Sequence, residues 1–276
     1  MISDSQREAA RRFRQQHLAP PLLVLPNAWD AASARVLEQA GFSAIGTTSS
    51  GVAAALGYPD GQHIGRELLV ESLARITRVV SCPVTADIEA GYGESVEEVL
   101  QTVRAVIDAG AVGINIEDSR DQALVELPFQ VELLKAIRQC ADSLNFPLVI
   151  NARADVYLVP GIEPAARFSE VVKRAQAYRE AGADCLFLLN VGDATLIAEL
   201  VQALSIPLSL AVGPSTPPVV ELERLGVARV SLAGGLMRAA LGHLQRVARE
   251  LHDSGTYASL HDGSLSSAEF RGLFQK

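Results

Sequence analysis

The chain has 276 residues, of which 49% are hydrophobic and 20% are charged, and this composition excludes an intrinsically disordered protein. Its 32 acidic and 24 basic residues give a formal net charge of −8, which argues against a general nucleic-acid-binding protein. The length suits one large domain of the α/β-barrel size or two small ones. Acidic residues that gather at one place in the sequence would therefore point to a functional site.

Neither the cysteines nor the N-terminus indicates an exported protein. Cys82, Cys140 and Cys185 are far apart and form no CxxC pair, so no disulfide framework or structural zinc site is expected. The segment from Met1 to His17 lacks the apolar core of a signal peptide, and the longest uncharged runs are broken by Gly, Ser, Thr or Pro. We expect a cytoplasmic protein that neither spans a membrane nor binds nucleic acid.

Eight short apolar runs recur along the chain, and each is followed by a stretch with helical character. Several runs come after an Ala-Gly or Leu-Gly pair, such as Ala109-Gly110, which suits a left-handed helix end, and others come after a proline, such as Pro83. Near-continuous apolar strands that alternate with helices indicate a parallel sheet covered by helices. The runs span residues 22–25, 44–46, 84–88, 113–116, 148–150, 185–189, 208–212 and 229–232.

Helix start signals follow the same alternation. Asp30 is placed to cap a helix that runs through Gln39, and Ser95 precedes a segment whose apolar residues have helical spacing. Eight strand–helix units predict an α/β fold of the (β/α)₈ TIM barrel type. A doubly wound open sheet is the alternative, but the chain has no Gly-rich dinucleotide-binding turn.

No linker divides the sequence, so residues 1–276 are predicted to form a single barrel domain. Residues 251–276 are expected to be a C-terminal helical extension, in which Ser266 and Glu269 resemble a capping box for one more short helix. Such a helix packs either on a partner subunit or on its own barrel.

Polar residues collect where the third, fourth and fifth strands are predicted to end. Since side chains alternate along a strand, residues two apart share a side, and in a TIM barrel the active site lies at these strand ends. An acid in the loop after strand two, Asp60, adds to the group. The sets are Asp87 with Glu89, Asn115 with Glu117, and Asn151 with Arg153 and Asp155.

Carboxylates that share a site repel one another unless protons or a cation compensate. Oxygen ligands without Cys or His favour Mg²⁺ or Mn²⁺ over zinc. We expect Asp87 to contact the metal and the other acids to hold its water ligands. The alternative is that each acid only caps a helix or lies in a loop, but four acids near adjacent strand ends favour the metal site.

Other residues near the strand ends each allow two interpretations. Arg153 either binds a substrate carboxylate through two hydrogen bonds of its guanidinium or only forms an ion pair with Asp155 or Glu117. The small residues from Ser49 to Gly51 let backbone N–H groups approach an anion, although many such loops bind nothing. Trp29 either lines the pocket or packs the barrel rim. Asn190, at the end of strand six, either contacts substrate or caps a loop.

Five segments together resemble the isocitrate lyase/phosphoenolpyruvate mutase superfamily, close to its small members of the 2-methylisocitrate lyase, oxaloacetate decarboxylase and phosphonopyruvate-processing types. They are LPNAWDAASA (25–34), TTSSGVAAALGYPDG (47–61), PVTADIEAGYG (83–93), GINIEDS (113–119) and NARADVYL (151–158). The resemblance covers nearly the whole chain. It implies an Mg²⁺-dependent (β/α)₈ barrel that binds a small anionic 2-oxo acid, and a homo-oligomer, commonly a tetramer whose last helix is exchanged between subunits.

The resemblance also implies roles for individual residues. Asp87 matches the direct metal ligand, while Asp60, Glu89 and Glu117 match the acids that hold metal-bound water. Catalytic roles are expected for Arg153, Asp60 and Glu117. Contacts with substrate are expected for Trp29, Ser50, Gly51, Asp87, Arg153 and Asn190, with Asn27 beside Trp29 at the pocket rim.

The sequence departs from the superfamily in the lid after strand four. Isocitrate and methylisocitrate lyases carry there a catalytic cysteine within a Lys-Arg/Lys-Cys-Gly-His loop, whereas the segment from Ser119 to Leu127 has neither Cys nor His. The lysine and asparagine of mutase lids are also missing, and Glu89 stands where many members have Asp. We therefore expect a short lid and leave the proton donor open among Arg120, Asp121 and a metal-bound water.

The expected activity is Mg²⁺-dependent cleavage of a carbon–carbon bond in a small 2-oxo or 2-hydroxy di- or tricarboxylic acid, through an enolate. The missing cysteine argues against isocitrate-type cleavage. Phosphonopyruvate chemistry is the alternative reaction, and ketopantoate hydroxymethyl transfer is a more distant one. A protein that binds 2-oxo acids with little turnover is the alternative outside enzymes.

Overall fold

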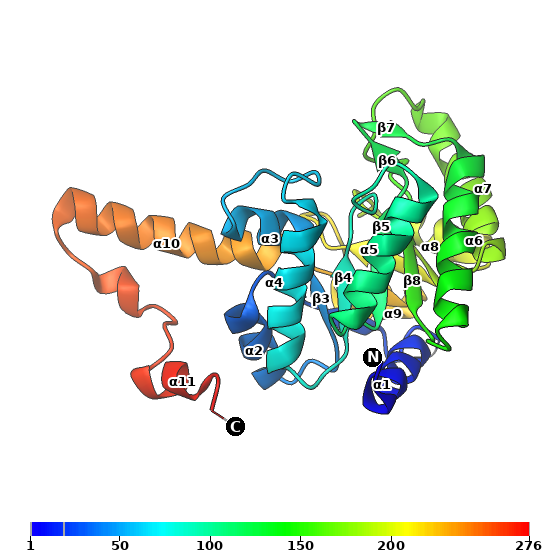
Figure 1. The fold of residues 1–276 in the computed structure, drawn as a ribbon. Helices are drawn as coiled ribbons and strands as arrows, with labels where there is room; N and C mark the ends of the chain where they lie inside the picture. The colour runs from blue at the N-terminus through cyan, green and yellow to red at the C-terminus, as the bar shows by residue number, and fades with distance from the viewer. Residues whose placement is uncertain (1, 19, 276) are drawn as a thin grey trace.

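The apolar runs of the sequence form one parallel sheet that curls into a barrel, in a computed structural model that describes residues 2–18 and 20–275 (Figure 1). Its strands follow the order β1-β11-β10-β9-β8-β5-β4-β3-β2. The predicted (β/α)₈ TIM barrel fold is confirmed. The strands are β1 (Leu23–Leu25), β2 (Asn27–Ala28), β3 (Ile45–Thr47), β4 (Val84–Asp87), β5 (Gly113–Glu117), β8 (Val149–Arg153), β9 (Cys185–Leu188), β10 (Leu208–Ala211) and β11 (Arg229–Ser231).

The sheet returns on itself through one strand that is interrupted at Pro26. β1 pairs in parallel with β11, and β2, which begins directly after Pro26, pairs in parallel with β3. Proline has no N–H to donate to a neighbouring strand, and this accounts for the break. The Pro26 carbonyl still accepts from the N–H of Gly46 at 2.9 Å. The nine segments therefore correspond to the eight strands that the sequence predicts.

Helices cover the outside of the sheet, with their apolar faces turned inward. On α5, Val99, Val103 and Val106 are fully buried, at the spacing of one helical face. Asp30 and Ser95 form capping boxes at the starts of α2 and α5, as predicted. The helices are α1 (Asp4–Gln15), α2 (Ala31–Gln39), α3 (Ser49–Ala55), α4 (Gly65–Val79), α5 (Val96–Asp108), α6 (Leu127–Ser143), α7 (Pro164–Glu180), α8 (Ala194–Ala203) and α9 (Val219–Arg224).

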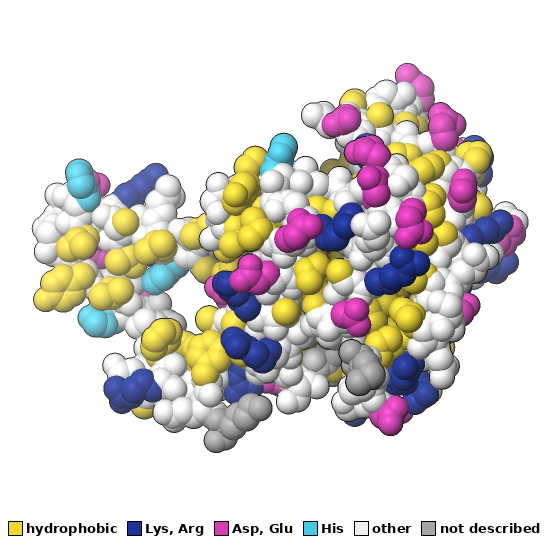
Figure 2. All heavy atoms as spheres, viewed as in Figure 1, with side chains coloured by type: hydrophobic (Ala, Val, Ile, Leu, Met, Phe, Trp, Pro, Cys, Tyr) yellow, Lys and Arg dark blue, Asp and Glu magenta, His cyan; other side chains and the backbone are white. Residues whose placement is uncertain are grey.

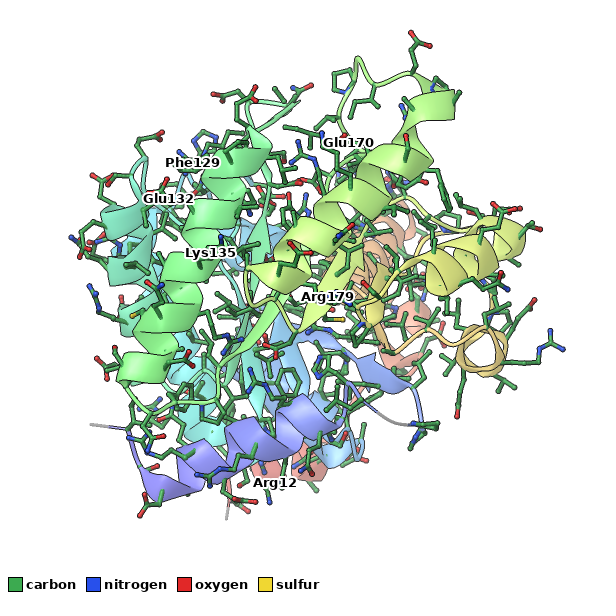
Figure 3. The ribbon with its side chains drawn as sticks, turned by 90° about the vertical axis from the view of Figure 1, so that its right-hand side faces the viewer. Arg12, Phe129, Glu132, Lys135, Glu170 and Arg179 are labelled. Carbon is green, nitrogen blue, oxygen red and sulfur yellow. The ribbon has the colours of Figure 1, made fainter. Side chains whose placement is uncertain are left out.

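The N-terminal helix closes the end of the barrel where the strands begin. Figure 3 shows α1, marked by Arg12, lying across this end below α6 and α7. Phe13 is fully buried and lies so close to Gly113, the first residue of β5, that a β-carbon there would meet its ring at 2.9 Å. With this end closed, the cavity of the barrel opens where the strands end.

The C-terminal part leaves the barrel and then returns to it. Helix α10 (Gly235–Ser254) contains no buried residue and ends at Gly255, whose φ of 67° is left-handed. A 3₁₀ turn (Ala258–His261) and α11 (Ser267–Gly272) follow, and the carbonyl of Leu273 accepts from Nε of Arg35 at 2.6 Å (Figure 1). The predicted capping box at Ser266 is present. The predicted extension, residues 251–276, comprises the last turn of α10, the 3₁₀ turn and α11, and its assignment as an extension of a single barrel domain stays a prediction.

Within residues 2–18 and 20–275, no helix combines the length and the apolar character that crossing a membrane requires.

Candidate active site

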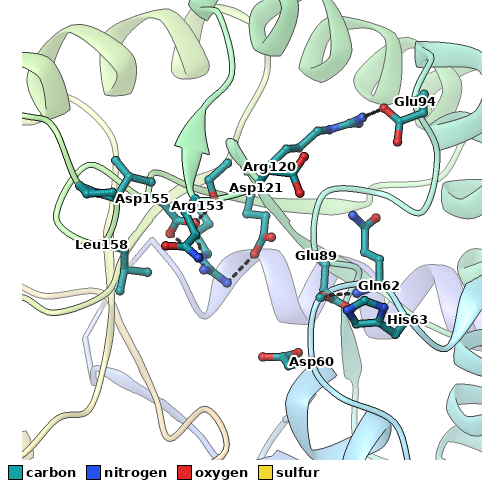
Figure 4. A pocket seen from close by; sticks show the side chains of 16 residues that line it. Asp60, Gln62, His63, Glu89, Glu94, Arg120, Asp121, Arg153, Asp155 and Leu158 are labelled. Atoms are coloured by element: carbon teal, nitrogen blue, oxygen red, sulfur yellow. Dashed lines mark hydrogen bonds and ion pairs between the residues drawn. The ribbon is translucent and has the colours of Figure 1, made fainter.

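A cavity of about 750 Å³ opens where β4, β5 and β8 end (Figure 4). Its lining is rich in charged side chains that come from several strand ends and from the loops above them. This is the position at which TIM barrels carry their active sites. The charged residues of the lining are Asp60, Glu89, Glu94, Glu117, Arg120, Asp121, Arg153 and Asp155.

Asp87, the last residue of β4, is held by Ser49 at the start of α3. The backbone N–H and the hydroxyl of Ser49 both donate to Oδ2 of Asp87, at 3.0 and 2.8 Å. The N–H of Asp87 in turn donates to the Thr47 hydroxyl at 2.9 Å. Hydrogen bonds to a carboxylate are the stronger, charge-assisted kind. These contacts therefore fix the carboxylate of Asp87 at the strand end.

Glu89 follows β4 in a left-handed backbone conformation, with a φ of 49°. Its carboxylate accepts from the N–H of Gln62 at 2.8 Å and from the hydroxyl of Tyr92. Burial raises the pKa of Glu89 to about 7, and the neighbouring charges of Asp87 and Asp60 contribute to that rise. The sequence placed Glu89 at this site, whereas its partners Gln62 and Tyr92 carried no signal in the local pattern.

Glu117, at the end of β5, contacts the guanidinium of Arg153, with Oε2 at 2.6 Å from Nη1. Burial raises the pKa of Glu117 to about 8 against the opposing effect of Arg153, and the charges of Asp155, Asp87 and Glu89 add to the rise. For Asp60, in the loop after α3, burial raises the pKa and Asp87 is the next cause. The charge of Asp87 thus acts on Asp60, Glu89 and Glu117 alike.

The tertiary structure therefore brings together the acids that the sequence singled out. The donor set consists of oxygens, and its mutual repulsion is the kind that a divalent cation offsets, so these residues fit Mg²⁺ or Mn²⁺. In the described part of the chain, no three His, Cys, Asp or Glu side chains lie close enough together to ligate one metal directly. One direct ligand with three acids reached through water stays a prediction.

Arg153 makes both ion pairs that the sequence left open. Its Nε and Nη2 donate to Oδ1 and Oδ2 of Asp155 at 2.6 and 2.9 Å, and its Nη1 pairs with Glu117. A guanidinium has five N–H donors, two of them on each Nη. One N–H on Nη1 and one on Nη2 thus remain beyond these pairs. Charge balance and the binding of an anion are compatible in this geometry, in which Arg153 lines the cavity (Figure 4).

Of the six predicted substrate contacts, Arg153 lines this cavity, whereas Asp87, Trp29, Ser50, Gly51 and Asn190 do not. Trp29 instead lines an apolar hollow beside α11, together with Phe270 and Leu273, as its rim-packing interpretation expects. Asn190 is exposed, with a left-handed φ of 57°, which suits a loop cap. Ser50 and Gly51 lie in the first turn of α3 beside Ser49.

The lid segment is a short hairpin, as the sequence predicted, formed by β6 (Ser119–Arg120) and β7 (Ala123–Leu124). Asp121 and Gln122 join the two strands with φ values of 48° and 62°, the two positive values of a type I′ turn. Arg120 fastens the hairpin, since its Nη1 contacts Glu94 at 2.6 Å and its Nη2 donates to the carbonyl of Gly93 at 2.7 Å. Both Arg120 and Asp121 line the cavity.

Carboxylates gathered at the strand ends of a parallel barrel define an enzyme of the TIM barrel class. The sequence pattern of the phosphoenolpyruvate phosphomutase family matches residues 13–252. The chain therefore belongs to this family, within the PEP mutase/isocitrate lyase superfamily.

Two similar sequences illustrate the relationship. An uncharacterized protein of Mycobacterium tuberculosis is 34% identical over 241 residues, which cover 87% of this chain and 89% of the relative. The 2-methylisocitrate lyase of Escherichia coli is 31% identical over 248 residues, covering 84% of this chain and 81% of the relative.

Solved structures agree with the fold. A Burkholderia cenocepacia protein, assigned provisionally as a lyase/mutase, superposes with a TM-score of 0.91 at 35% identity, covering 99% of this chain and 98% of its own. A 2,3-dimethylmalate lyase superposes with a TM-score of 0.84 at 25% identity, covering 96% of this chain and 94% of its own. Of these four proteins, the two with an assigned reaction are lyases.

Proposed function

We propose that the protein is a cytoplasmic carbon–carbon lyase that cleaves a small 2-oxo or 2-hydroxy di- or tricarboxylic acid. The observation that carries the proposal is the position of Arg153 beside Asp60, Glu89 and Glu117 in one cavity, with two guanidinium N–H groups left over. These three acids and Asp87 are called the acid cluster. A cation-binding side next to an anion-binding side suits a substrate that carries a 2-oxo acid at one end and a carboxylate at the other. The names of the relatives, 2-methylisocitrate lyase and 2,3-dimethylmalate lyase, support this substrate class.

The acid cluster is proposed to hold Mg²⁺, with Mn²⁺ as the other suitable ion. Asp87 is the proposed direct ligand, and Asp60, Glu89 and Glu117 are proposed to hold the water molecules around the ion. A divalent cation in this position supplies Lewis-acid polarisation of the substrate's 2-oxo oxygen.

The side chains around the cluster bind and orient the substrate. Arg153 is proposed to bind the distal carboxylate through its free Nη hydrogens, while Glu117 and Asp155 keep the guanidinium in place. Ser50 and Gly51 are proposed to present backbone N–H groups to the 2-oxo acid end, because they follow Ser49, which contacts Asp87. Trp29 and Asn190 stay proposed contacts at the rim.

Cleavage leaves an enolate, which must then take up a proton. Asp60 and Glu117 are proposed to take part in holding and moving that proton, since both line the cavity. Arg120 and Asp121 lie on the hairpin above it and are the proposed alternatives from the lid.

The activity is tested with a panel of C4 to C7 acids, including oxaloacetate and 2-methylisocitrate, assayed with Mg²⁺ by coupling pyruvate release to lactate dehydrogenase. We expect release from at least one acid, and none after Arg153→Ala. Phosphonopyruvate is assayed beside this panel, and release of pyruvate from it alone would instead indicate carbon–phosphorus bond cleavage. Binding of 2-oxo acids without turnover of any member would indicate a binding protein.

We also propose that the protein forms a homo-oligomer, a dimer or a tetramer, through its C-terminal part. Leu241, Leu244 and Leu251 of α10 are 48%, 60% and 55% exposed, and the helix leads away from its own barrel (Figure 2). A run of exposed leucines on a projecting helix is typical of a protein–protein contact. Exchange of α10 and α11 between subunits would cover these residues.

A further inference from the structure

Asp118 is a fully buried carboxylate that faces away from the cavity, although it directly follows Glu117, which lines it. Its Oδ2 accepts from the hydroxyl of Tyr178 at 2.6 Å and from Nη1 of Arg174 at 3.0 Å. Both donors come from α7, sixty and fifty-six residues along the chain from Asp118. The Tyr178 hydroxyl also accepts from Arg174 at 3.1 Å, so the three side chains form a closed group.

The other oxygen of Asp118 connects this group to the active site. Oδ1 accepts from the backbone N–H of Asp155 at 2.8 Å. Asp155 is 1% exposed and holds the guanidinium of Arg153 with two hydrogen bonds. A continuous chain of contacts therefore runs from Tyr178 and Arg174, on the outer helix layer, through Asp118 and Asp155 to Arg153.

The same group also holds the base of the lid hairpin. The N–H of Val125, which directly follows β7, donates to the carbonyl of Asp118 at 2.9 Å, and the carbonyl of Val125 accepts from Nη2 of Arg174 at 3.2 Å. The lid hairpin and the segment that carries Arg153 and Asp155 are thus both connected by hydrogen bonds to the same side chains of α7.

A buried ion pair of this kind is poor evidence for stability, because apolar residues of the same volume are often as stable or more so. What it does provide is geometry, because each oxygen of Asp118 has a partner from a defined direction, and one of these partners is the backbone N–H of Asp155. A charged group that is fully satisfied by hydrogen bonds holds its neighbours in one arrangement.

We propose that Asp118, Arg174 and Tyr178 are positioning residues for Arg153. By fixing Asp155, they aim the two free Nη hydrogens of Arg153 at the distal carboxylate of the substrate. The part of this inference that concerns the substrate rests on the proposed function, whereas the part that concerns the orientation of Arg153 does not.

The experiment uses Tyr178→Phe, which removes one hydroxyl, and Asp118→Asn, which alters the whole group. Tyr157→Phe is the matched control, because this half-buried tyrosine lies two residues after Asp155 and its hydroxyl makes no hydrogen bond in the described part of the chain. The first measurement is the Nε–H resonance of Arg153 in the NMR spectrum, assigned by its loss in Arg153→Lys. The second is the affinity for oxaloacetate and for pyruvate, which lacks the distal carboxylate, by calorimetry with Mg²⁺.

We expect Tyr178→Phe to broaden or shift the Arg153 resonance and to accelerate its hydrogen exchange, with Tyr157→Phe unchanged. Oxaloacetate should bind about tenfold more weakly to Tyr178→Phe, a change of about 1.4 kcal/mol. Pyruvate affinity should change less than about twofold, since pyruvate does not need Arg153. If Asp118→Asn folds, the change in the Arg153 resonance and the loss of oxaloacetate affinity should both be larger than in Tyr178→Phe.

An unchanged Arg153 resonance in Tyr178→Phe would overturn the inference, as would equal losses of affinity for both acids. If the unaltered protein binds neither acid, the proposed function fails, and the resonance still decides whether α7 positions Arg153.

Discussion

Ser49 and Asp87 are joined twice, since the backbone N–H and the hydroxyl of Ser49 both reach Oδ2 of Asp87, at 3.0 and 2.8 Å. The other oxygen, Oδ1, has only a long contact of 3.5 Å from the N–H of Glu89 among the described residues. One oxygen of the carboxylate is thus anchored to the barrel, and the other is left for a ligand. This asymmetry is what a monodentate metal ligand requires.

Asp87→Ala should therefore remove the stabilisation of the protein by Mg²⁺. A ligand present at a hundred times its Kd stabilises the folded state by about 2.7 kcal/mol, and this appears as a rise in Tm. We expect Mg²⁺ to raise the Tm of the unaltered protein, EDTA to reverse the rise, and neither to affect Asp87→Ala. Asp142→Ala, an exposed acid at the end of α6, is the control. An equal Mg²⁺ response in Asp87→Ala would place the metal elsewhere.

Arg153→Lys should weaken substrate binding more than it lowers kcat. Lysine keeps the charge that Glu117 and Asp155 require, but it lacks the planar fork that two hydrogen bonds to a carboxylate need. The loss of one charge-assisted hydrogen bond is worth about 1.5–3 kcal/mol, so KM should rise about tenfold to a hundredfold. Steady-state kinetics on the acid that gives turnover measure this. Arg104→Lys, in an exposed pair with Glu97, should leave KM unchanged.

His17 should make the stability of the protein depend on pH. It is 3% exposed, its Nδ1 lies 2.8 Å from the Phe13 carbonyl, and Nε2 faces the guanidinium of the buried Arg229. Burial, and then Arg229, lower the pKa of His17 to about 3, from an ordinary value near 6.5. Between pH 3 and pH 6.5, His17 is therefore protonated in the unfolded chain and neutral in the folded protein.

The contribution of His17 is consequently full above pH 6.5 and declines as the pH falls toward 3, by about 1.4 kcal/mol per unit. Urea unfolding at pH 7.5 and 5.5 measures the difference in the free energy of unfolding. His17→Gln should show a smaller loss than the unaltered protein by about 1.4 kcal/mol over this interval. The exposed His252→Gln should behave like the unaltered protein. Parallel pH profiles for His17→Gln and the unaltered protein would contradict the expectation.

Leu244→Glu should dissociate the proposed oligomer. Leu244 lies on α10 and is 60% exposed in the single chain, so a buried carboxylate would appear only if a partner covers it. Light scattering coupled to size exclusion should give a smaller mass for Leu244→Glu than for the unaltered protein. Val220→Glu, at an 81% exposed position on α9, is the control and should leave the mass unchanged. A monomeric mass for the unaltered protein would refute the oligomer directly.

Much of the fold follows from local pattern. Short apolar runs separated by Ala-Gly pairs and prolines predicted the eight strands, because the spacing of apolar residues reflects which side of the chain is buried. Asp30, Ser95 and Ser266 predicted helix starts that the structure confirms, since a cap needs only its own three following residues.

The sequence pattern along each strand also predicted the acids of the site. Parallel strands end at one face, where Asp87 lies level with Asn115 and Glu117 with Arg153, and alternation along the strands turns Glu117 and Arg153 toward the cavity. The sequence pattern could not predict which residue forms a hydrogen bond with each of these side chains. Ser49 reaches Asp87 across thirty-eight residues, and which loop residue does so depends on how β3 and β4 are placed side by side.

Tertiary packing also gave surroundings to residues that the sequence by itself could not place. Trp29 lies at the apolar hollow beside α11, because Phe270 and Leu273 from the C-terminal end of the chain line the same hollow. Asp118 carries no signal of its own in the sequence, and it links α7 to Arg153 only because two donors distant in the sequence contact it. The sequence alone determined the strands, the helix caps and the inward-facing charges, since burial pattern and capping are short-range effects. The pairing of those charges was decided by the tertiary structure, because closing the barrel sets the strand register that brings distant residues into contact.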